Sequence, residues 1–227
     1  SIAFGHAAGN TNQGANAVAI GYVAASGNQG PDAIAIGYNA GQTSQGANAV
    51  SIGKYAGNTS QSADSIAIGT FAGNSAQGGN SIAIGRVAGN TNQGPSAVAI
   101  GISAGNTNQG DAAIAIGRWA GNSSQGANAI AFGRNAGNIT QADEAIAIGH
   151  TAGSNVQGTA AVAIGWQAGS LGQAPYAVAI GAYAGNLNQG SNSVAIGAFA
   201  GYPTTANNAV VINGLPSALN APDSGFY

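Results

Sequence analysis

The sequence predicts an all-β protein: a parallel β-solenoid of thirteen coils with 16 residues in each coil. Three observations lead to this prediction. A pattern close to A-I-A-I-G-x-x-A-G-N-x-x-Q-G-x-N repeats from Ser1 to Asn208 without an insertion. Its fifth position is glycine and its eighth is alanine in all thirteen copies. A fixed period of this length is typical of chains that stack similar coils rather than wrap around one central core.

The first four positions of each repeat predict a short β-strand, because β-branched residues recur there and side chains alternate between the two faces of a strand. Positions two and four are Ile, Val or Phe and share one face. We expect this bulky apolar face to point into the coil and form the core. The predicted core residues are Ile2, Phe4, Ile34, Ile36, Ile66, Ile68, Ile114, Ile116, Val178 and Ile180.

Positions one and three of this strand are almost always Ala or Ser, which makes its other face flat. Two aliphatic side chains per coil contribute about 3–6 kcal/mol of burial, whereas ordering one coil costs on the order of 20 kcal/mol. Burial of the flat face between chains would reduce this deficit, so we hypothesise that it contacts a neighbouring subunit. The predicted subunit-contact residues are Ala3, Ala19, Ala35, Ala67, Ala83, Ala99 and Ala115.

The remaining positions predict the corners and a second strand. Glycine at position five ends the first strand and turns the chain, because glycine alone takes a positive φ without strain. The Ala-Gly pair at positions eight and nine indicates a second inward contact and bend. Positions eleven to thirteen predict a second short strand, whose Thr and Gln would share one face. Stacked coils would align the Gln column, from Gln13 to Gln189, into amide ladders.

We expect residues 1–208 to form the solenoid and residues 209–227 to form a C-terminal cap or linker, because the pattern decays after Tyr202-Pro203.

Composition narrows the possible partners. Charged residues make up only 4% of the chain, against about 25% in ordinary soluble proteins. A formal net charge of −2 indicates no nucleic-acid partner. No apolar run approaches the ~18 residues of a membrane span, so we expect no membrane insertion.

The exceptions to the repeat fall at defined positions. Lys54, the arginines and both histidines occupy position six, and the acidic residues of the repeats occupy positions fifteen and sixteen. Most aromatic residues lie at positions six and seven, so this corner tolerates large side chains and should project outward. The predicted surface-binding residues are Tyr22, Tyr38, Tyr55, Arg86, Arg118, Trp119, Arg134, Trp166 and Tyr183.

Three interpretations of this corner remain open. In the first, it is a variable solvated edge. In the second, it is an aromatic and cationic ridge that contacts a host surface, a glycan or a neighbouring fibre. In the third, its arginines pair with acids of the next subunit in a symmetric oligomer. Such exposed ion pairs would contribute little stability.

Catalysis is not indicated. The sequence holds no nucleophile–base–acid set, and Asp143 and Glu144 are adjacent, so they would point apart in an extended segment. With no cysteine and only two histidines, metal ligands are missing at useful spacings. No lysine follows the glycines as a phosphate-binding loop requires. We expect a protein that is not an enzyme and that uses neither a metal nor a cofactor.

The blocks S-I-A-I-G at residues 65–69 and 81–85, and S-V-A-I-G at 193–197, resemble the head repeats of YadA-like trimeric autotransporter adhesins. The resemblance covers residues 1–208, although those heads have a slightly shorter coil. It implies a left-handed β-roll, a homotrimer around one axis, and binding to a host matrix or cell surface. The 16-residue form A-I-A-I-G-x-x-A-G is similar to fibre proteins of giant algal viruses and phage tail fibres. The ending L-N-A-x-x-S-G-F-Y, at residues 219–227, resembles the segment that links a viral fibre shaft to a cleaved chaperone domain.

The leading functional hypothesis is a structural and adhesive rod on an extracellular, cell or virion surface, which presents positions six and seven for multivalent contact. A self-assembling filament is an alternative, because the ends of a solenoid expose strand edges. Ice binding is a further alternative. It would use an uncharged column of Thr or Ser two residues before Gln, at Thr11, Thr43, Thr59, Ser75, Thr91, Thr107 and Ser123. This column is interrupted by Gly27, Ile139, Asn155, Leu171 and Leu187.

Overall fold

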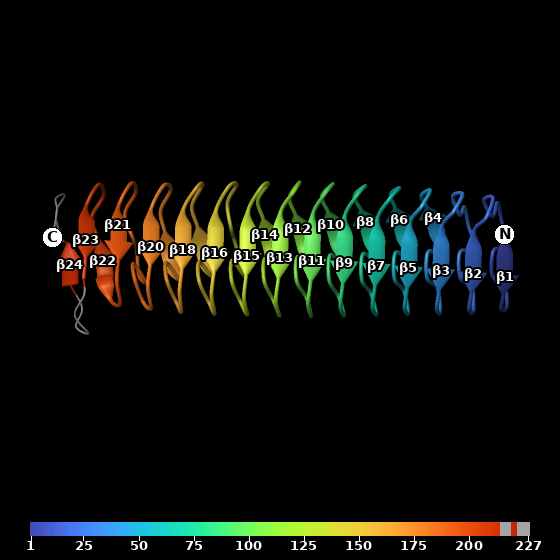
Figure 1. The fold of residues 1–227 in the computed structure, drawn as a ribbon, viewed down its shortest axis with the longest axis horizontal. Coiled ribbons are helices and arrows are strands. Elements are labelled where there is room, and N and C mark those ends of the chain that lie inside the picture. Colours follow the sequence, from blue (N-terminus) through green and yellow to red (C-terminus); the bar gives the residue numbers. More distant parts are fainter. Residues whose placement is uncertain (214–218, 222–227) are drawn as a thin grey trace. The chain divides into compact units, whose positions relative to one another are not determined.

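The computed structural model describes residues 1–213 and 219–221, and within them the chain consists of strands and turns without a helix. The predicted fold class is confirmed: parallel strands recur every 16 residues and stack as the coils of a β-solenoid (Figure 1). The final residues of the fibre-like ending, 222–227, lie outside the described part.

The chain divides into two compact units, residues 1–112 and 113–227. Each unit has a long sheet, built from positions two to four of the repeat. In the first unit its strands are, in spatial order, β1 (Ile2–Phe4), β2 (Val18–Ile20), β3 (Ile34–Ile36), β5 (Val50–Ile52), β7 (Ile66–Ile68), β9 (Ile82–Ile84) and β11 (Val98–Ile100). In the second unit they are β13 (Ile114–Ile116), β15 (Ile130–Phe132), β16 (Ile146–Ile148), β18 (Val162–Ile164), β20 (Val178–Ile180), β21 (Val194–Ile196) and β23 (Val210–Ile212).

Positions eleven to thirteen form the short strands on the other side of each coil. In the first unit these are β4 (Thr43–Gln45), β6 (Thr59–Gln61), β8 (Ser75–Gln77), β10 (Thr91–Gln93) and β12 (Thr107–Gln109). In the second unit they are β14 (Ser123–Gln125), β17 (Asn155–Gln157) and β19 (Leu171–Gln173). The remaining strands, β22 (Ala200–Thr205) and β24 (Leu219–Ala221), pair with each other.

Strand register follows the repeat. Ile66 pairs with Ile82, and Ala67 pairs with Ala83, so residues at the same position lie directly above one another. The corner glycine permits this close stacking. Gly69 has a φ of 127°, and a Cβ there would lie 2.7 Å from the carbonyl oxygen of Gly85 in the next coil. Any other residue would be strained and would push the coils apart.

The predicted core is wrong, because the structure turns the long-sheet strands the other way. None of the ten predicted core residues is buried, and Phe4, Ile2 and Ile180 are 74%, 60% and 36% exposed. The buried face is instead the flat one at positions one and three. The residues in error are Ile2, Phe4, Ile34, Ile36, Ile66, Ile68, Ile114, Ile116, Val178 and Ile180.

The predicted subunit contact is wrong for the same reason. Within a single chain, Ala19, Ala35, Ala67, Ala83, Ala99 and Ala115 have no exposed surface, so no second chain can touch them. Ala3, in the first coil, is the one exposed member of that group. The expectation that position eight makes a second inward contact is confirmed, since Ala40 and Ala120 are fully buried.

The width of the coil explains the inversion. A Cβ placed on Gly73, at position nine, would lie 3.1 Å from the Ala67 methyl group and 2.4 Å from the Gln77 side chain. The two walls of the coil are therefore too close together for an isoleucine side chain. Alanine methyl groups and flat glutamine amides fill the space, in agreement with the close packing of protein interiors.

The expected amide ladder is present in segments. Gln141 donates through Nε2 to the Gln157 Oε1 at 3.1 Å, and Gln157 donates in the same way to Gln173. The same Gln141 Nε2 also donates to the carbonyl oxygen of Ile130 at 2.8 Å. An amide of this kind ties the two walls of its coil together and binds to the next coil, which satisfies polar groups that would otherwise be costly to bury.

Two further details differ from the sequence prediction. The central residue of the short strands has a left-handed conformation, as in Ser60 with a φ of 55°, so Thr59 points outward while Gln61 is buried. Threonine and glutamine therefore do not share a face. At the other end of the chain, β23 pairs with β21 in the 16-residue register, so the long sheet continues past residue 208.

Candidate functional surface

The corner at positions six and seven carries a continuous row of aromatic rings in the first unit. His6, Tyr22 and Tyr38 stack with ring centroids 5.1 Å apart at each step. Tyr38 meets Tyr55 edge to face at 5.5 Å, and Tyr55 stacks on Phe71 at 5.0 Å. One ring per coil matches the spacing of neighbouring strands, so this row follows directly from the repeat. We call these five residues the aromatic row.

The same corner in the second unit combines aromatic and cationic groups. The Arg118 guanidinium lies 4.0 Å from the ring centroid of Trp119, a cation–π contact. Arg134 Nη2 lies 2.8 Å from His150 Nε2, within hydrogen-bond distance, and the guanidinium can act only as the donor. Further along, Tyr183 stacks on Phe199 at 5.0 Å.

All nine predicted surface-binding residues lie on this corner. Tyr22, Tyr38, Arg86, Arg118, Trp119, Arg134 and Trp166 are exposed, and Tyr55 and Tyr183 are half-buried. The structure thus brings aromatic residues of neighbouring coils together in rows, whereas each arginine lies in a different coil. Whether these residues bind a partner remains a prediction.

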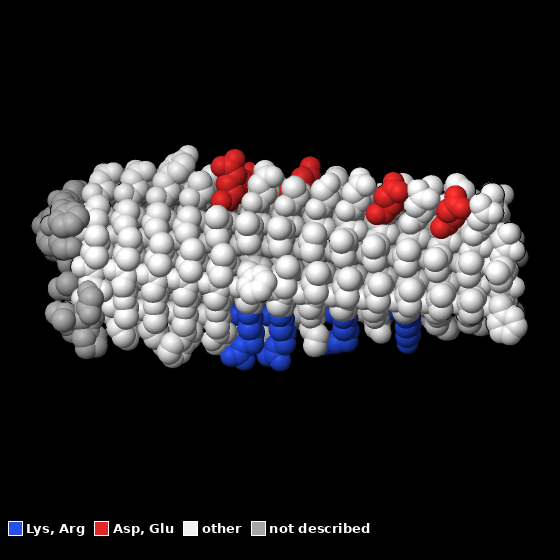
Figure 2. Space-filling model, in the orientation of Figure 1, with Lys and Arg blue, Asp and Glu red and all other residues white. Residues whose placement is uncertain are grey.

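Charged residues separate to opposite edges of the coils (Figure 2). Lysine and arginine follow the ends of long-sheet strands, at position six. Aspartate and glutamate precede the starts of long-sheet strands, at positions fifteen and sixteen. Some of these carboxylates are fixed by the neighbouring coil: Asp64 Oδ1 accepts from Asn48 Nδ2 at 3.0 Å, and Asp143 Oδ1 accepts from the Ala127 N–H at 2.9 Å.

An uninterrupted apolar face lies between these edges. It consists of the outward side chains at positions two and four, which we call the aliphatic face. In the first unit, Ile20, Ile52 and Ile84 are 36–37% exposed, with partly exposed valines and isoleucines beside them. Contiguous exposed apolar surface of this kind marks an interaction site in soluble proteins. Sequence reasoning missed this surface because it assigned the same residues to the core.

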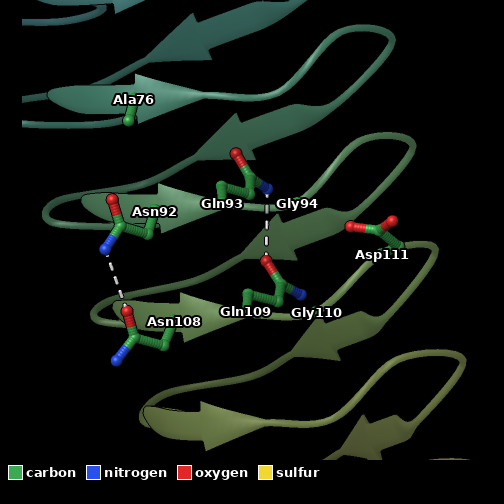
Figure 3. A pocket seen from close by; sticks show the side chains of 8 residues that line it. All are labelled: Ala76, Asn92, Gln93, Gly94, Asn108, Gln109, Gly110 and Asp111. Carbon is green, nitrogen blue, oxygen red and sulfur yellow. Dashed lines mark hydrogen bonds between the residues drawn. The ribbon is translucent and has the colours of Figure 1, made fainter.

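The short strands of the first unit border an open groove of about 440 Å³, over β8, β10 and β12 (Figure 3). Its lining includes an exposed amide pair, in which Asn92 Nδ2 donates to Asn108 Oδ1 at 3.0 Å, and Asp111 stands at one end. Outward hydroxyl groups at position eleven lie in register along these strands, as in the pairing of Thr91 with Thr107. The groove is polar and nearly uncharged, and it holds no nucleophile with a base beside it.

Nowhere in residues 1–213 or 219–221 do three His, Cys, Asp or Glu side chains gather as metal ligands would. In the same part of the chain no helix has the length and hydropathy needed to cross a membrane. No protein-family model matches the chain, and no curated protein matches it significantly.

Proposed function

We propose that this protein is a non-enzymatic structural component of an extracellular or virion surface fibre, and that it self-associates through the aliphatic face. One observation carries the proposal: the alanine-filled interior leaves two aliphatic side chains per coil on the outside. An isolated chain would leave this whole face in water. The face is continuous along the long sheet of each unit, as a shaft built from parallel copies requires.

The free energy available from this face is adequate for association. Fully burying an isoleucine is worth about 1.5–3 kcal/mol, so covering the exposed third of one contributes about 0.5–1 kcal/mol. The seven long-sheet strands of the first unit hold fourteen such positions, which gives roughly 7–14 kcal/mol from that unit of each chain. Association costs an estimated 4–15 kcal/mol. No single coil could drive association, but the repeated array can.

Adhesion is the second part of the proposal. The corner at positions six and seven presents rings and guanidinium groups at one-coil intervals, including the exposed Tyr22, Arg118 and Trp166. Repeated weak contacts to a surface or glycan gain strength by multivalency. The resemblance to adhesin heads and viral fibres, and a homotrimer as the assembled form, are consistent with this arrangement and belong to the same proposal.

Absolute mass in solution, by light scattering at two concentrations, tests the self-association. The monomer is 21.6 kDa, and a stable mass three times larger is expected. The double variant Ile52→Ser with Ile84→Ser should shift the protein toward monomer. Ile139→Ser is the matched control, because Ile139 is 50% exposed but lies at position eleven, away from the aliphatic face.

The outcomes are distinct. A wild-type monomer at both concentrations would overturn the proposal. A mass that climbs with concentration would favour the self-assembling filament instead. Equal loss of association in Ile139→Ser would show that the aliphatic face is not the specific contact.

Ice binding is a second candidate, favoured by one observation. In the first unit, Thr43, Thr59, Ser75, Thr91 and Thr107 form an in-register column of outward hydroxyl groups on parallel strands. A flat, uncharged and regularly spaced hydroxyl array is suited to ordered water. Thermal hysteresis of a dilute solution, lost in Thr59→Lys, would support it; normal freezing at high concentration would exclude it.

A further inference from the structure

The tyrosines of the aromatic row are not equivalent to one another. Tyr22 and Tyr38 both occupy position six, in neighbouring coils of the first unit. Their rings stack with centroids 5.1 Å apart and an angle of 10° between the ring planes. Tyr38 and Tyr55 lie at different positions of the repeat, and their rings meet at 70°. Within the described part of the chain, Tyr22 and Tyr38 are therefore the one pair of tyrosines that stacks face to face.

The backbone holds these two rings in matching places. Ile20 pairs with Ile36 in the long sheet, and each of these residues lies two positions before one of the tyrosines. The N–H of Asn39 donates to the carbonyl oxygen of Tyr22 at 3.0 Å, which ties the two corners together directly. Because the corners are equivalent and the rings are nearly parallel, we infer that equivalent ring atoms face each other. Holding two reactive groups side by side in this way favours a reaction between them.

Both rings are also open to solvent. Tyr22 is 49% exposed and Tyr38 is 44% exposed, so a small oxidant can reach either phenol group. Exposed side chains change rotamer on the picosecond to nanosecond timescale. The rings can therefore make the small movement that a bond between them requires, without a change in the packed interior.

We propose that Tyr22 and Tyr38 form a site of oxidative modification, at which hydrogen peroxide and a haem peroxidase couple the two rings into a dityrosine within one chain. Each phenol loses one electron and its hydroxyl proton to the oxidant. The unpaired electron of each phenoxyl radical is shared with the Cε atoms beside the oxygen, and a bond forms between one Cε of each ring. The hydrogen on each of these carbons then moves to the phenol oxygen. One hydrogen peroxide is reduced to two waters, and the chain loses two hydrogen atoms.

The new bond would link two neighbouring coils at their corner. A crosslink stabilises a fold mainly by restricting the unfolded chain. Each coil of a solenoid contacts only its neighbours, so a link between two coils acts where the stack can separate. The site lies within one chain and does not depend on the proposed self-association.

Oxidation of the full chain with hydrogen peroxide and a haem peroxidase tests the site. Cleavage before Asp32 and Asp64 places Tyr22 and Tyr38 in different peptides, residues 1–31 and 32–63. Mass spectrometry should find these two peptides joined, with two hydrogen atoms missing. The denatured chain should keep the mass of a monomer, because the link is within one chain.

Conservative variants identify the two rings that react. Tyr22→Phe and Tyr38→Phe each keep the stacked ring but remove a phenol oxygen, so each should abolish the joined peptides and leave the chain folded. Tyr55→Phe is the matched control, because it makes the same change in the same row and in the same peptide as Tyr38; it should leave the joined peptides unchanged. Tyr176→Phe controls for exposure alone, since Tyr176 is 60% exposed but has no aromatic ring beside it among the described residues.

Urea unfolding tests the effect of the link on the stack. After oxidation, the wild-type protein should unfold at a higher urea concentration than Tyr22→Phe treated in the same way. Equal midpoints, with the joined peptides present, would show that the link does not hold the coils together.

Three other results would overturn the site itself. Joined peptides that persist in Tyr38→Phe would place the coupling at Tyr55 instead. Oxidation that modifies Tyr176 but leaves peptides 1–31 and 32–63 separate would show that exposure, and not stacking, decides which tyrosine reacts. A product found only at twice the mass of the chain would show coupling between copies. None of these results bears on the mass in solution, which tests the proposed function separately.

Discussion

Replacing Gly85 with alanine should lower the free energy of unfolding by about 2–6 kcal/mol. Gly85 has a φ of 127°, a conformation almost restricted to glycine, and other residues there cost of order 1–3 kcal/mol. An added Cβ would also lie 2.6 Å from the carbonyl oxygen of Gly101. Overpacking of this kind costs typically 1–3 kcal/mol. The two costs add because the clash is with backbone, which cannot rotate away.

Gly79→Ala is the matched control, at the corner that precedes the same long-sheet strand. A Cβ on Gly79 would meet its nearest atom, the Ala63 carbonyl oxygen, at 3.5 Å, an ordinary contact. Its free energy of unfolding should stay within about 0.5 kcal/mol of wild type. Urea unfolding followed by circular dichroism measures both variants. The change in the free energy of unfolding is the shift in the urea midpoint multiplied by the m-value, the slope of free energy against urea concentration. Equal midpoints for the two variants would refute the stated role of the corner glycine in coil spacing.

Further substitutions address the interior and the surface. Gln141→Leu should lower the free energy of unfolding by about 2–4 kcal/mol, because the Ile130 carbonyl and the Gln157 amide oxygen lose a buried donor; an unchanged urea midpoint would contradict this. Tyr38→Ala should cost about 1–2 kcal/mol, since it removes the ring contacts on both sides, and thermal unfolding would reveal it. Ile139→Ser should lower the free energy of unfolding by only about 1 kcal/mol, because half of that side chain is already exposed; a much larger drop in the same thermal assay would show hidden packing.

Much of the fold could be predicted because the repeat itself encodes it. Strands, corner glycines and the amide column recur at fixed positions, and the structure places them there. The candidate surface was predictable in part: side chains such as Tyr22 and Trp166 stand out because nothing else in the repeat varies so widely in size. The aliphatic face was missed, since apolar residues are ordinarily assigned to the interior.

A signal for the correct orientation was present in the sequence. Positions one, three and eight accept little beyond Ala and Ser, whereas positions two and four accept Val, Ile and the much larger Phe4 and Phe132. A strict limit on size indicates a crowded interior, and tolerance of size indicates an outward position. The balance of free energies also indicated that one chain buries too little apolar surface alone.

The period, the strand and corner positions, and the separation of acids from cations follow from the amino-acid sequence alone, because each depends only on where residues recur along the chain. Which face of the strand lies inside follows from the folded coil. That choice depends on the gap between the two walls of a coil, set by contacts such as Gly73 with Gln77 across the interior. A gap filled by a methyl group and an amide leaves no room for isoleucine, and so the most apolar residues of the chain become its outer surface.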